Sequence, residues 1–308
     1  MIWRLESMAK GGLEGTVLGT LVMPYCSGIG NLIFAFVMGR QGGSATEVMT
    51  NCLVNNVTNM TLILGVPAII WSMDLVPAKK AKKSKAGKEN KKGRDAYRLN
   101  KLSLLLTLVA VLFFSGITWV MGLNGKIGFT DGVVLVLLFL FWQCFHVYDV
   151  LKANAQQNRG FGGMFFINLL LLAVGAYAVY VSTDWLVAWV SKSHTGFISA
   201  KYIGWLSGFL MVVPNGMMAV YYAWTKRPEV VYTSQVGDGH ICIPLEIGVF
   251  ALYRPILTPP FFQTGMLLLL AAASVHLFFI GFFNSLPRYV GIILVLAYLY
   301  FLCNGLLK

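Results

Sequence analysis

Long apolar runs separated by short polar connectors dominate this chain. Nine of the runs are longer than the roughly 18 residues that mark a membrane-spanning helix. They are continuously apolar and lack the in-and-out alternation of a transmembrane β-strand. The pattern therefore predicts an all-α polytopic membrane protein, with spans over residues 15–38, 46–71, 102–121, 133–152, 163–183, 202–224, 230–253, 261–283 and 288–307.

The composition agrees with this pattern and excludes a soluble domain. Hydrophobic residues make up 57% of the chain and charged residues only 12%, whereas soluble domains contain about 25% charged residues. The opening segment MIWRLESMAKGGLEG has no apolar core or cleavage site of a signal peptide. We therefore expect the first span itself to direct insertion.

Positive charge is concentrated in one connector. Eleven of the 24 Lys and Arg residues lie between Lys79 and Lys101. A cytoplasmic loop at residues 78–101, facing lipid headgroups, explains them without a nucleic-acid partner. With the N-terminus and this loop in the cytoplasm and the C-terminus outside, 18 of the basic residues lie inside and 6 outside. The positive-inside rule favours this orientation.

Two polar patches interrupt the apolar background at matching intervals. In the first half, Asn31 precedes Asn51 by twenty residues, and in the second half Asn215 precedes Gln235 by twenty. The order is the same in both: an amide in one helix, a hairpin, then an amide in the next helix. The matching order predicts an internal repeat, with residues 15–71 in a first half (1–153) and residues 202–253 in a second half (154–308).

The repeat is expected to be inverted, because an odd number of spans separates its two copies. Many secondary transporters build a midplane site from inverted repeats with helices broken at Gly or Pro. Gly30 and Pro214 stand immediately before the first amide of each copy and are predicted to weaken the helix there. Polar side chains at that depth mark a cation site or, alternatively, helix–helix packing. The candidate ligands are Asn31, Asn51, Asn55, Asn59, Asn215, Gln235, Asp238 and Glu246.

Glu246 is the strongest single signal among these candidates, because no polar residue lies next to it in the run ICIPLEIG. An intramembrane acid is a functional hypothesis by default. The alternatives are a structural pairing with His276 or Arg254, or a neutral, protonated acid. The five cysteines lie within apolar runs without metal-binding spacing, and we interpret them as small buried residues.

Two helix starts can also be predicted. Ser44 and Glu47 have the spacing of a capping box at the start of the second span. Pro228 and Glu229 place a proline and an acid in the first turn of the seventh span.

The segments GTLVMPYCSGIGN and TNCLVNNVTNMTLILG resemble the calcium/cation antiporter superfamily of the sodium/calcium exchanger type. That family carries two α-repeats, each with a G-x-S-L-P-E helix followed by a G-N-x-x-G-S-N-x-x-N helix. In the second half, VVPNGMM stands in place of S-L-P-E, and SLPRYVGIILVLAYLYFL is similar to the family's last helix. The resemblance implies inverted repeats around a cation-exchange site.

The chain departs from the family motifs at diagnostic positions. Asn31 and Asn215 replace the two motif glutamates, and Ser234-Gln235 replaces the second Gly-Asn. By equal spacing, His240 and Ile243 stand where the later asparagines are expected. The helix before the first repeat has no counterpart in the first residues of this sequence. Because calcium favours several carboxylates, the neutral amides suit sodium or a proton-coupled cation better than high-affinity calcium.

Two functions from different classes follow from these observations. The first is secondary-active transport of small cations, Na⁺ or Ca²⁺, by alternating access, without a resident cofactor. The alternative is a non-transporting membrane subunit or scaffold, in which a helix of another membrane subunit could fill the position of the first helix. The chain contains no P-loop, H-E-x-x-H or G-x-S-x-G motif, so we do not expect an enzyme. The expected partners are the lipid bilayer and small cations.

Overall fold

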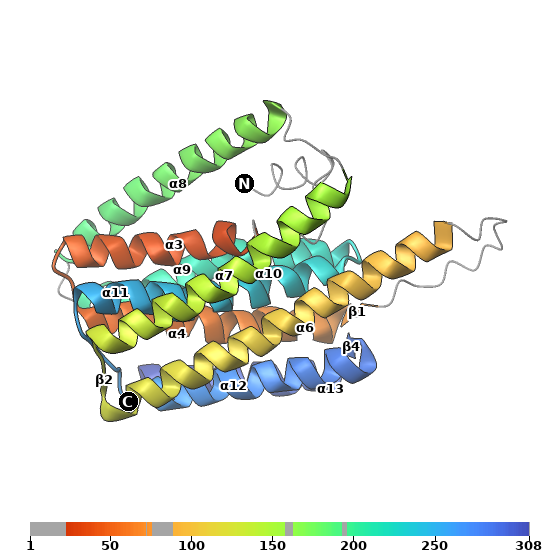
Figure 1. Cartoon of the computed structure of the whole chain (residues 1–308). Helices are drawn as coiled ribbons and strands as arrows, with labels where there is room; N and C mark the ends of the chain where they lie inside the picture. Colours follow the sequence, from red (N-terminus) through yellow and green to blue (C-terminus); the bar gives the residue numbers. More distant parts are fainter. Residues whose placement is uncertain (1–22, 72, 76–88, 158–162, 193–195, 308) are drawn as a thin grey trace.

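The computed structural model describes residues 23–71, 73–75, 89–157, 163–192 and 196–307. Within these ranges, seven helices are long and apolar enough to cross a membrane, and two shorter apolar helices cover Gly28–Arg40 and Phe129–Phe145. Each predicted span overlaps one of these nine segments. The all-α membrane fold is therefore confirmed (Figure 1).

The elements of the first half are α-helices with short irregular insertions and two short strands. They are α3 (Met23–Arg40), α4 (Ala45–Thr58), the π-helix η2 (Asn59–Ile63), α5 (Leu64–Ile70), β1 (Met73–Asp74), α6 (Glu89–Met121), the 3-10 helix η3 (Gly122–Asn124), β2 (Lys126–Ile127) and α7 (Phe129–Gln157).

The second half repeats much of this order. Its elements are α8 (Gly163–Val190), the 3-10 helix η4 (Ala200–Tyr202), α9 (Ile203–Trp224), α10 (Pro228–Ile241), the π-helix η5 (Cys242–Glu246), α11 (Ile247–Tyr253), β3 (Ile256–Leu257), α12 (Phe262–Phe278), the π-helix η6 (Phe279–Phe283), β4 (Ser285–Leu286) and α13 (Arg288–Leu306).

The internal repeat is visible in the lengths of the elements. The rod α4–η2–α5 has segments of 14, 5 and 7 residues, and the rod α10–η5–α11 has segments of the same three lengths. Both π-helices begin after 14 α-helical residues, at Asn59 and Cys242. A π-helix inserts a wider turn that leaves the regular ladder and is frequent at functional sites. Each half therefore places its irregular turn at the same depth.

The two hairpins that precede these rods differ by one residue. Four residues (41–44) join α3 to α4, whereas three residues (225–227) join α9 to α10. Equal sequence spacing therefore pairs the wrong residues beyond the hairpin. The structure pairs Asn51 with Ser234, and it pairs Asn55 with Asp238. The positions equivalent to Asn56 and Asn59 are therefore corrected from His240 and Ile243 to Gly239 and Cys242.

The hairpins lie at opposite ends of the bundle, as an inverted repeat requires. The Arg254 guanidinium, at the end of α11, donates a hydrogen bond to the carbonyl of Gly43 in the first hairpin (Nη1 to O, 3.1 Å). The second hairpin lies at the other end of the α10–α11 rod. Two short antiparallel ladders also join the halves. Strand β1 pairs with β4 (Met73 opposite Leu286), and β2 pairs with β3 (Ile127 opposite Ile256).

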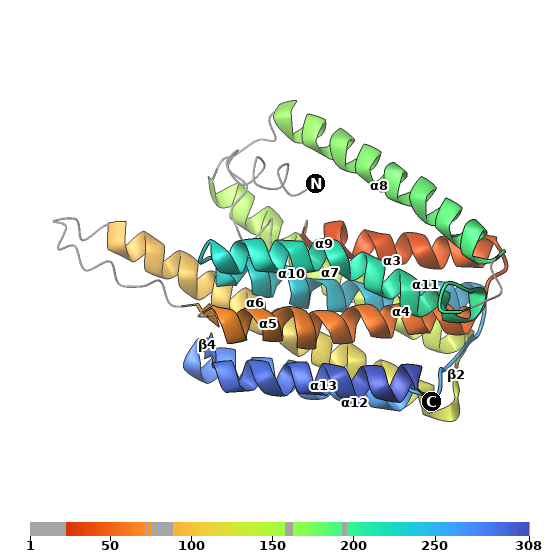
Figure 2. The ribbon, with the colours of Figure 1, turned by 180° about the vertical axis from the view of Figure 1, so that it is seen from behind.

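The helices of the two halves interlock, so the repeats do not pack as separate bodies. Helix α4 packs against α9, and its counterpart α10 packs against α3; α5 and α13 form a further pair, as do α11 and α7 (Figure 2). The division at residue 153 stays a prediction about sequence.

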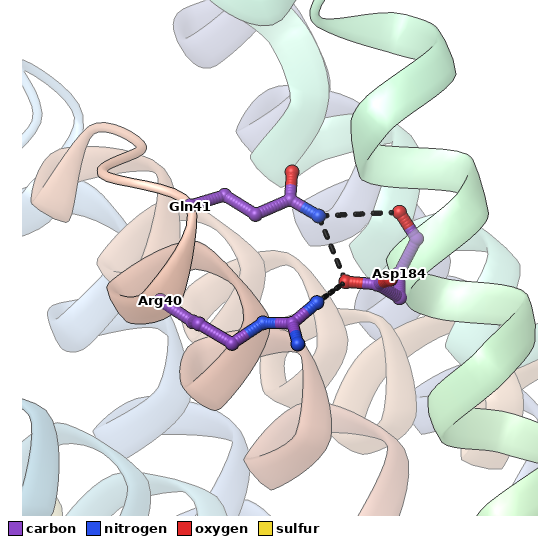
Figure 3. Close-up of polar contacts among 3 residues, drawn as sticks. All are labelled: Arg40, Gln41 and Asp184. Carbon is purple, nitrogen blue, oxygen red and sulfur yellow. Dashed lines mark hydrogen bonds and ion pairs between the residues drawn. The ribbon is translucent and has the colours of Figure 1, made fainter.

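Helix α8 lies on the outside of the bundle and crosses α3 obliquely (Figures 1 and 2). Half of its described side chains are exposed, and only Thr183, Val187 and Val190 among them are buried, which suits a helix that faces lipid. One end is held by a polar contact that Figure 3 shows. Asp184 forms an ion pair with Arg40 and accepts a hydrogen bond from the Gln41 amide (Nε2 to Oδ1, 2.8 Å).

Both predicted helix starts are confirmed, with Ser44 at the N-cap of α4, but the capping-box hydrogen bond predicted for Ser44 is wrong. Pro228 and Glu229 occupy the first turn of α10 as expected. Ser44 makes no side-chain cap. The carboxylate of Glu47 instead accepts the backbone N–H of Gly204 (2.8 Å), near the start of α9. An acceptor near the N-terminus of the neighbouring helix satisfies one of its orphan N–H groups, so Glu47 links the halves.

The predicted helix breaks at Gly30 and Pro214 are also wrong. Both residues lie inside continuous helices, α3 and α9. The irregular backbone lies instead at η2 and η5, in the partner helix of each hairpin. Membrane helices tolerate glycine and proline where neighbouring helices pack against them. For this reason Gly30 and Pro214 do not interrupt their helices.

Small residues bring two pairs of helices into backbone contact. A Cβ added at Gly132 would lie 2.8 Å from the carbonyl oxygen of Gly248, and one added at Gly291 would lie 2.7 Å from that of Gly65. These contacts join α7 to α11 and α13 to α5, which are repeat-equivalent pairs. Close approach at small residues is a main source of packing energy between membrane helices.

We expect Gly132→Ala and Gly291→Ala to destabilise the protein, because each methyl group would meet a backbone oxygen that cannot move alone. Overpacking of this kind costs about 1–3 kcal/mol. The midpoint of thermal unfolding in detergent measures the effect. Gly116→Ala is the matched control, since nothing lies within 4 Å of a Cβ there. Equal midpoints for all three variants would contradict the packing account.

Candidate functional site

Asp238 is the centre of a buried polar cluster between the two repeats. Its side chain is fully buried on α10. One carboxylate oxygen, Oδ2, accepts hydrogen bonds from the side-chain amides of Asn55 (2.6 Å), Asn59 (2.7 Å) and Asn215 (3.4 Å). These donors come from α4, η2 and α9, so three elements converge on one acid.

The amide row on α4 follows from helix geometry. Asn51, Asn55 and Asn59 are four residues apart, and side chains at that spacing lie on one helix face. All three are fully buried. Asn55 and Asn59 reach Asp238, whereas Asn51 donates to the hydroxyl of Ser207 on α9 (2.8 Å). The row therefore connects the acid at the centre to the packed seam between α4 and α9.

The remaining amide candidates lie around the same centre. Asn31 on α3 donates to the sulfur of Cys242 (3.2 Å). Gln235 donates to Ser234 (2.9 Å) and to the backbone carbonyl of Asn215 (3.4 Å). The structure thus brings six of the eight predicted residues into one connected network, and a seventh, Asn51, lies on the same face of α4 and bonds Ser207 beside it.

The donors of these amides are engaged, but their oxygens are not. Because an ionised carboxylate only accepts hydrogen bonds, Asp238 turns the N–H groups of its neighbours inward. Among the described residues, no hydrogen-bond partner is found for the buried side-chain oxygens of Asn31, Asn51, Asn55, Asn59 and Gln235. A buried amide oxygen without a partner costs free energy, whereas amide oxygens are good ligands for hard cations.

Glu246, the eighth candidate, lies at the end of η5, and only 1% of its surface is exposed. Neither carboxyl oxygen has a hydrogen-bond partner in the described part of the chain. The predicted structural partners are engaged elsewhere. His276 bonds the backbone carbonyl of Met60 (2.8 Å), and Arg254 bonds Gly43. The pairing alternatives for Glu246 are therefore wrong.

The charge balance of the interior favours a bound cation or proton. Within the described ranges, the buried carboxyl groups are those of Asp238 and Glu246, and no lysine or arginine is buried with them. An isolated charge in a low-dielectric interior is costly unless it is paired. A bound cation or a proton would offset the cost of burying these two acids.

The described interior contains no cluster of typical metal-binding side chains. In the residues that the structure describes, no group of three or more His, Cys, Asp or Glu side chains could hold a metal ion. A cation here would need amide oxygens for most of its ligands. Such a set of ligands would come from both halves of the repeat.

Sequence reasoning missed two residues of the network, Ser207 and Cys242. Cys242 follows Asp238 by four residues, one helical turn, and that spacing is the signal that could have identified it. Ser207 carries no comparable signal, because it meets Asn51 only through packing of α9 on α4. Of the other cysteines, Cys52 is buried as predicted, whereas Cys144 and Cys303 are exposed.

Comparisons with known proteins agree with this architecture. Residues 1–148 match the family model described as sodium/calcium exchanger protein. No curated protein matches the chain in sequence. The family match covers the first half, where the amide row lies.

The fold of the whole chain is similar to that of the sodium-calcium exchanger NCX_Mj. The structure soaked with 2.5 mM Na⁺ and 10 mM Sr²⁺ has a TM-score of 0.65 and 18% identity, covering 96% of this chain and 90% of that chain. The structure soaked with 2.5 mM Na⁺ and 0.1 mM Ca²⁺ has a TM-score of 0.65 and 17% identity, covering 99% and 91%. The predicted resemblance is confirmed, by sequence in the first half and by fold throughout.

We expect the effect of Asp238→Asn on stability to depend on the cation present. Asparagine keeps an oxygen for Asn55 and Asn59 but removes a buried charge. In a choline buffer without metal cations, the variant should therefore unfold no earlier than the wild type. A cation at one hundred times its Kd should then stabilise only the wild type, by about 2.7 kcal/mol. Thermal unfolding with and without Na⁺ or Ca²⁺ measures both effects. Equal cation stabilisation of both proteins would contradict a site centred on Asp238.

Proposed function

We propose that this chain, a member of the calcium/cation antiporter superfamily, moves small cations across the membrane through the site centred on Asp238. The observation that carries the proposal is the set of buried amide oxygens that have no hydrogen-bond partner among the described residues and that belong to side chains around the buried acid Asp238. Such groups are retained in membrane helices chiefly where they serve an ion pathway.

Alternating access follows from the repeat in this proposal. The site lies between two equivalent seams, α4 against α9 and α10 against α3. In inverted-repeat transporters, rocking one repeat against the other opens the site to one side at a time. Here the first seam carries the Glu47–Gly204 and Asn51–Ser207 hydrogen bonds. Breaking these bonds and forming contacts in the other seam would exchange the exposed side.

The choice of ion is constrained by charge. The positions of the family's motif glutamates are occupied by Asn31 and Asn215, so Asp238 is the acid at the centre, and Glu246 lies eight residues farther along the same rod. Calcium commonly takes six to eight oxygen ligands, several of them from carboxylates. A site with one central acid and neutral oxygens suits Na⁺, or a cation exchanged for protons, better than high-affinity Ca²⁺.

The alternative is a membrane subunit that keeps the fold without transport, and the loss of both motif glutamates favours it. A scaffold, however, gains nothing from two buried acids, because a helix interface of apolar or small residues would be more stable. The orientation with the basic segment at residues 78–101 in the cytoplasm belongs to the same proposal. The loop predicted for this segment is wrong for residues 89–101, which form the first part of helix α6.

Ion flux tests the proposal directly. Purified protein in liposomes should take up Na⁺ or Ca²⁺ down an imposed gradient. Asp238→Asn and Asn59→Ala should each reduce the rate at least about tenfold, since a ligand should matter at least as much as the groups that orient ligands. Cys303→Ser, an exposed position, is the control and should match the wild type. Absence of flux for either ion in the wild type would refute transport and favour the subunit.

A further inference from the structure

Cys242 lies in direct contact with the side chains of the candidate site. Its thiol is fully buried at the start of η5. The sulfur lies 3.7 Å from Oδ1 of Asp238, 3.2 Å from the amide nitrogen of Asn31 and 3.8 Å from that of Asn55. The thiol therefore contacts the central acid and amides from two other helices.

The repeat places Cys242 opposite a residue that already contacts the acid. Its counterpart in the first half is Asn59, which also begins a π-helix and donates to Asp238 (2.7 Å). The two repeats thus present an amide and a thiol to the same carboxylate.

Unpartnered oxygens point to a ligand at the same place. The side-chain oxygens of Asn31 and Asn55 have no partner in the described chain, although the nitrogens of the same amides contact the sulfur. The side-chain oxygen of Asn59 also has no partner there, although its nitrogen donates to Asp238. These oxygens are fully buried. The carboxylate of Asp238, the sulfur of Cys242 and the amide groups of three asparagines therefore belong to one set of direct contacts.

Sulfur changes which ions such a centre prefers. Thiolates favour soft or borderline metal ions, whereas Na⁺, Mg²⁺ and Ca²⁺ favour oxygen. When the metal binds, a metal–sulfur bond forms, the S–H bond breaks and the proton leaves to solvent. A divalent ion would then be neutralised by the thiolate of Cys242 and the carboxylate of Asp238.

From this geometry we propose that Cys242 is a direct cation ligand, and that the site selects soft or borderline divalent metal ions over Ca²⁺. The inference rests on the proposed cation site and adds its substrate class. Neutral amides in place of the motif glutamates weaken the site for hard divalent ions, and the sulfur supplies a ligand that only softer ions use well.

Cd²⁺ is a suitable probe, because its bond to a thiolate produces a charge-transfer absorption in the ultraviolet. Titration of the purified full-length protein with Cd²⁺ should produce this absorption and release one proton per ion. Cys242→Ser should abolish the absorption and lower the ratio of Cd²⁺ to Ca²⁺ affinity at least about tenfold. Cys52→Ser is the matched control. It also removes a buried thiol, but one that contacts the Asn56 amide of its own helix (3.5 Å).

The outcomes separate this inference from the proposed function. Absorption that depends on Cys242 and survives Cys52→Ser supports sulfur ligation. Absorption that survives Cys242→Ser, or is lost only in Cys52→Ser, overturns it. Binding of Na⁺ or Ca²⁺ without any Cd²⁺–thiolate absorption refutes the inference but leaves cation transport standing. Failure to bind any of the three ions refutes both.

Discussion

The structure depends on one constraint, the charge of Asp238 held in an apolar helical bundle. Water cannot solvate this carboxylate, so the protein surrounds one of its oxygens with amide N–H groups from three elements. The nitrogens of Asn55 and Asn59 are engaged in this way, and their oxygens have no hydrogen-bond partner among the described residues. Hydrogen bonding therefore stabilises the acid and leaves buried oxygens that the proposed cation would bind.

The inverted repeat explains how these groups converge. Matching rods bring the starts of their π-helices, Asn59 and Cys242, to the same acid from opposite halves. The two halves differ where function requires a difference. The first half contributes a row of amides, whereas the second contributes Asp238, the thiol and Glu246. A repeated backbone thus carries an asymmetric set of candidate ligands, and small residues such as Gly132 and Gly291 hold the rods at their packing distance.

Much of the fold could be predicted from the sequence, because membrane spans depend on one dominant free-energy term, the transfer of apolar side chains into lipid. The cluster was predictable for a related reason: a buried Asn or Asp is rare enough to stand out. Predictions of finer features were wrong where tertiary packing determines the local structure. The capping partner of Glu47 lies on another helix. The hairpin one residue shorter shifted the pairing of repeats, and packing kept α9 continuous through Pro214. Cys242 looked like an ordinary apolar residue until the fold placed Asp238 and Asn31 beside it.

The central claim is that a cation binds at Asp238 and the amide oxygens around it. Anomalous diffraction from crystals soaked in turn in Rb⁺, Sr²⁺ and Cd²⁺ would locate a bound ion directly. The account predicts a peak for at least one ion within ligand distance of Asp238 and of the side-chain oxygens of Asn55 and Asn59. Absence of a peak at this position for all three ions, with the amides still donating to Asp238, would contradict it.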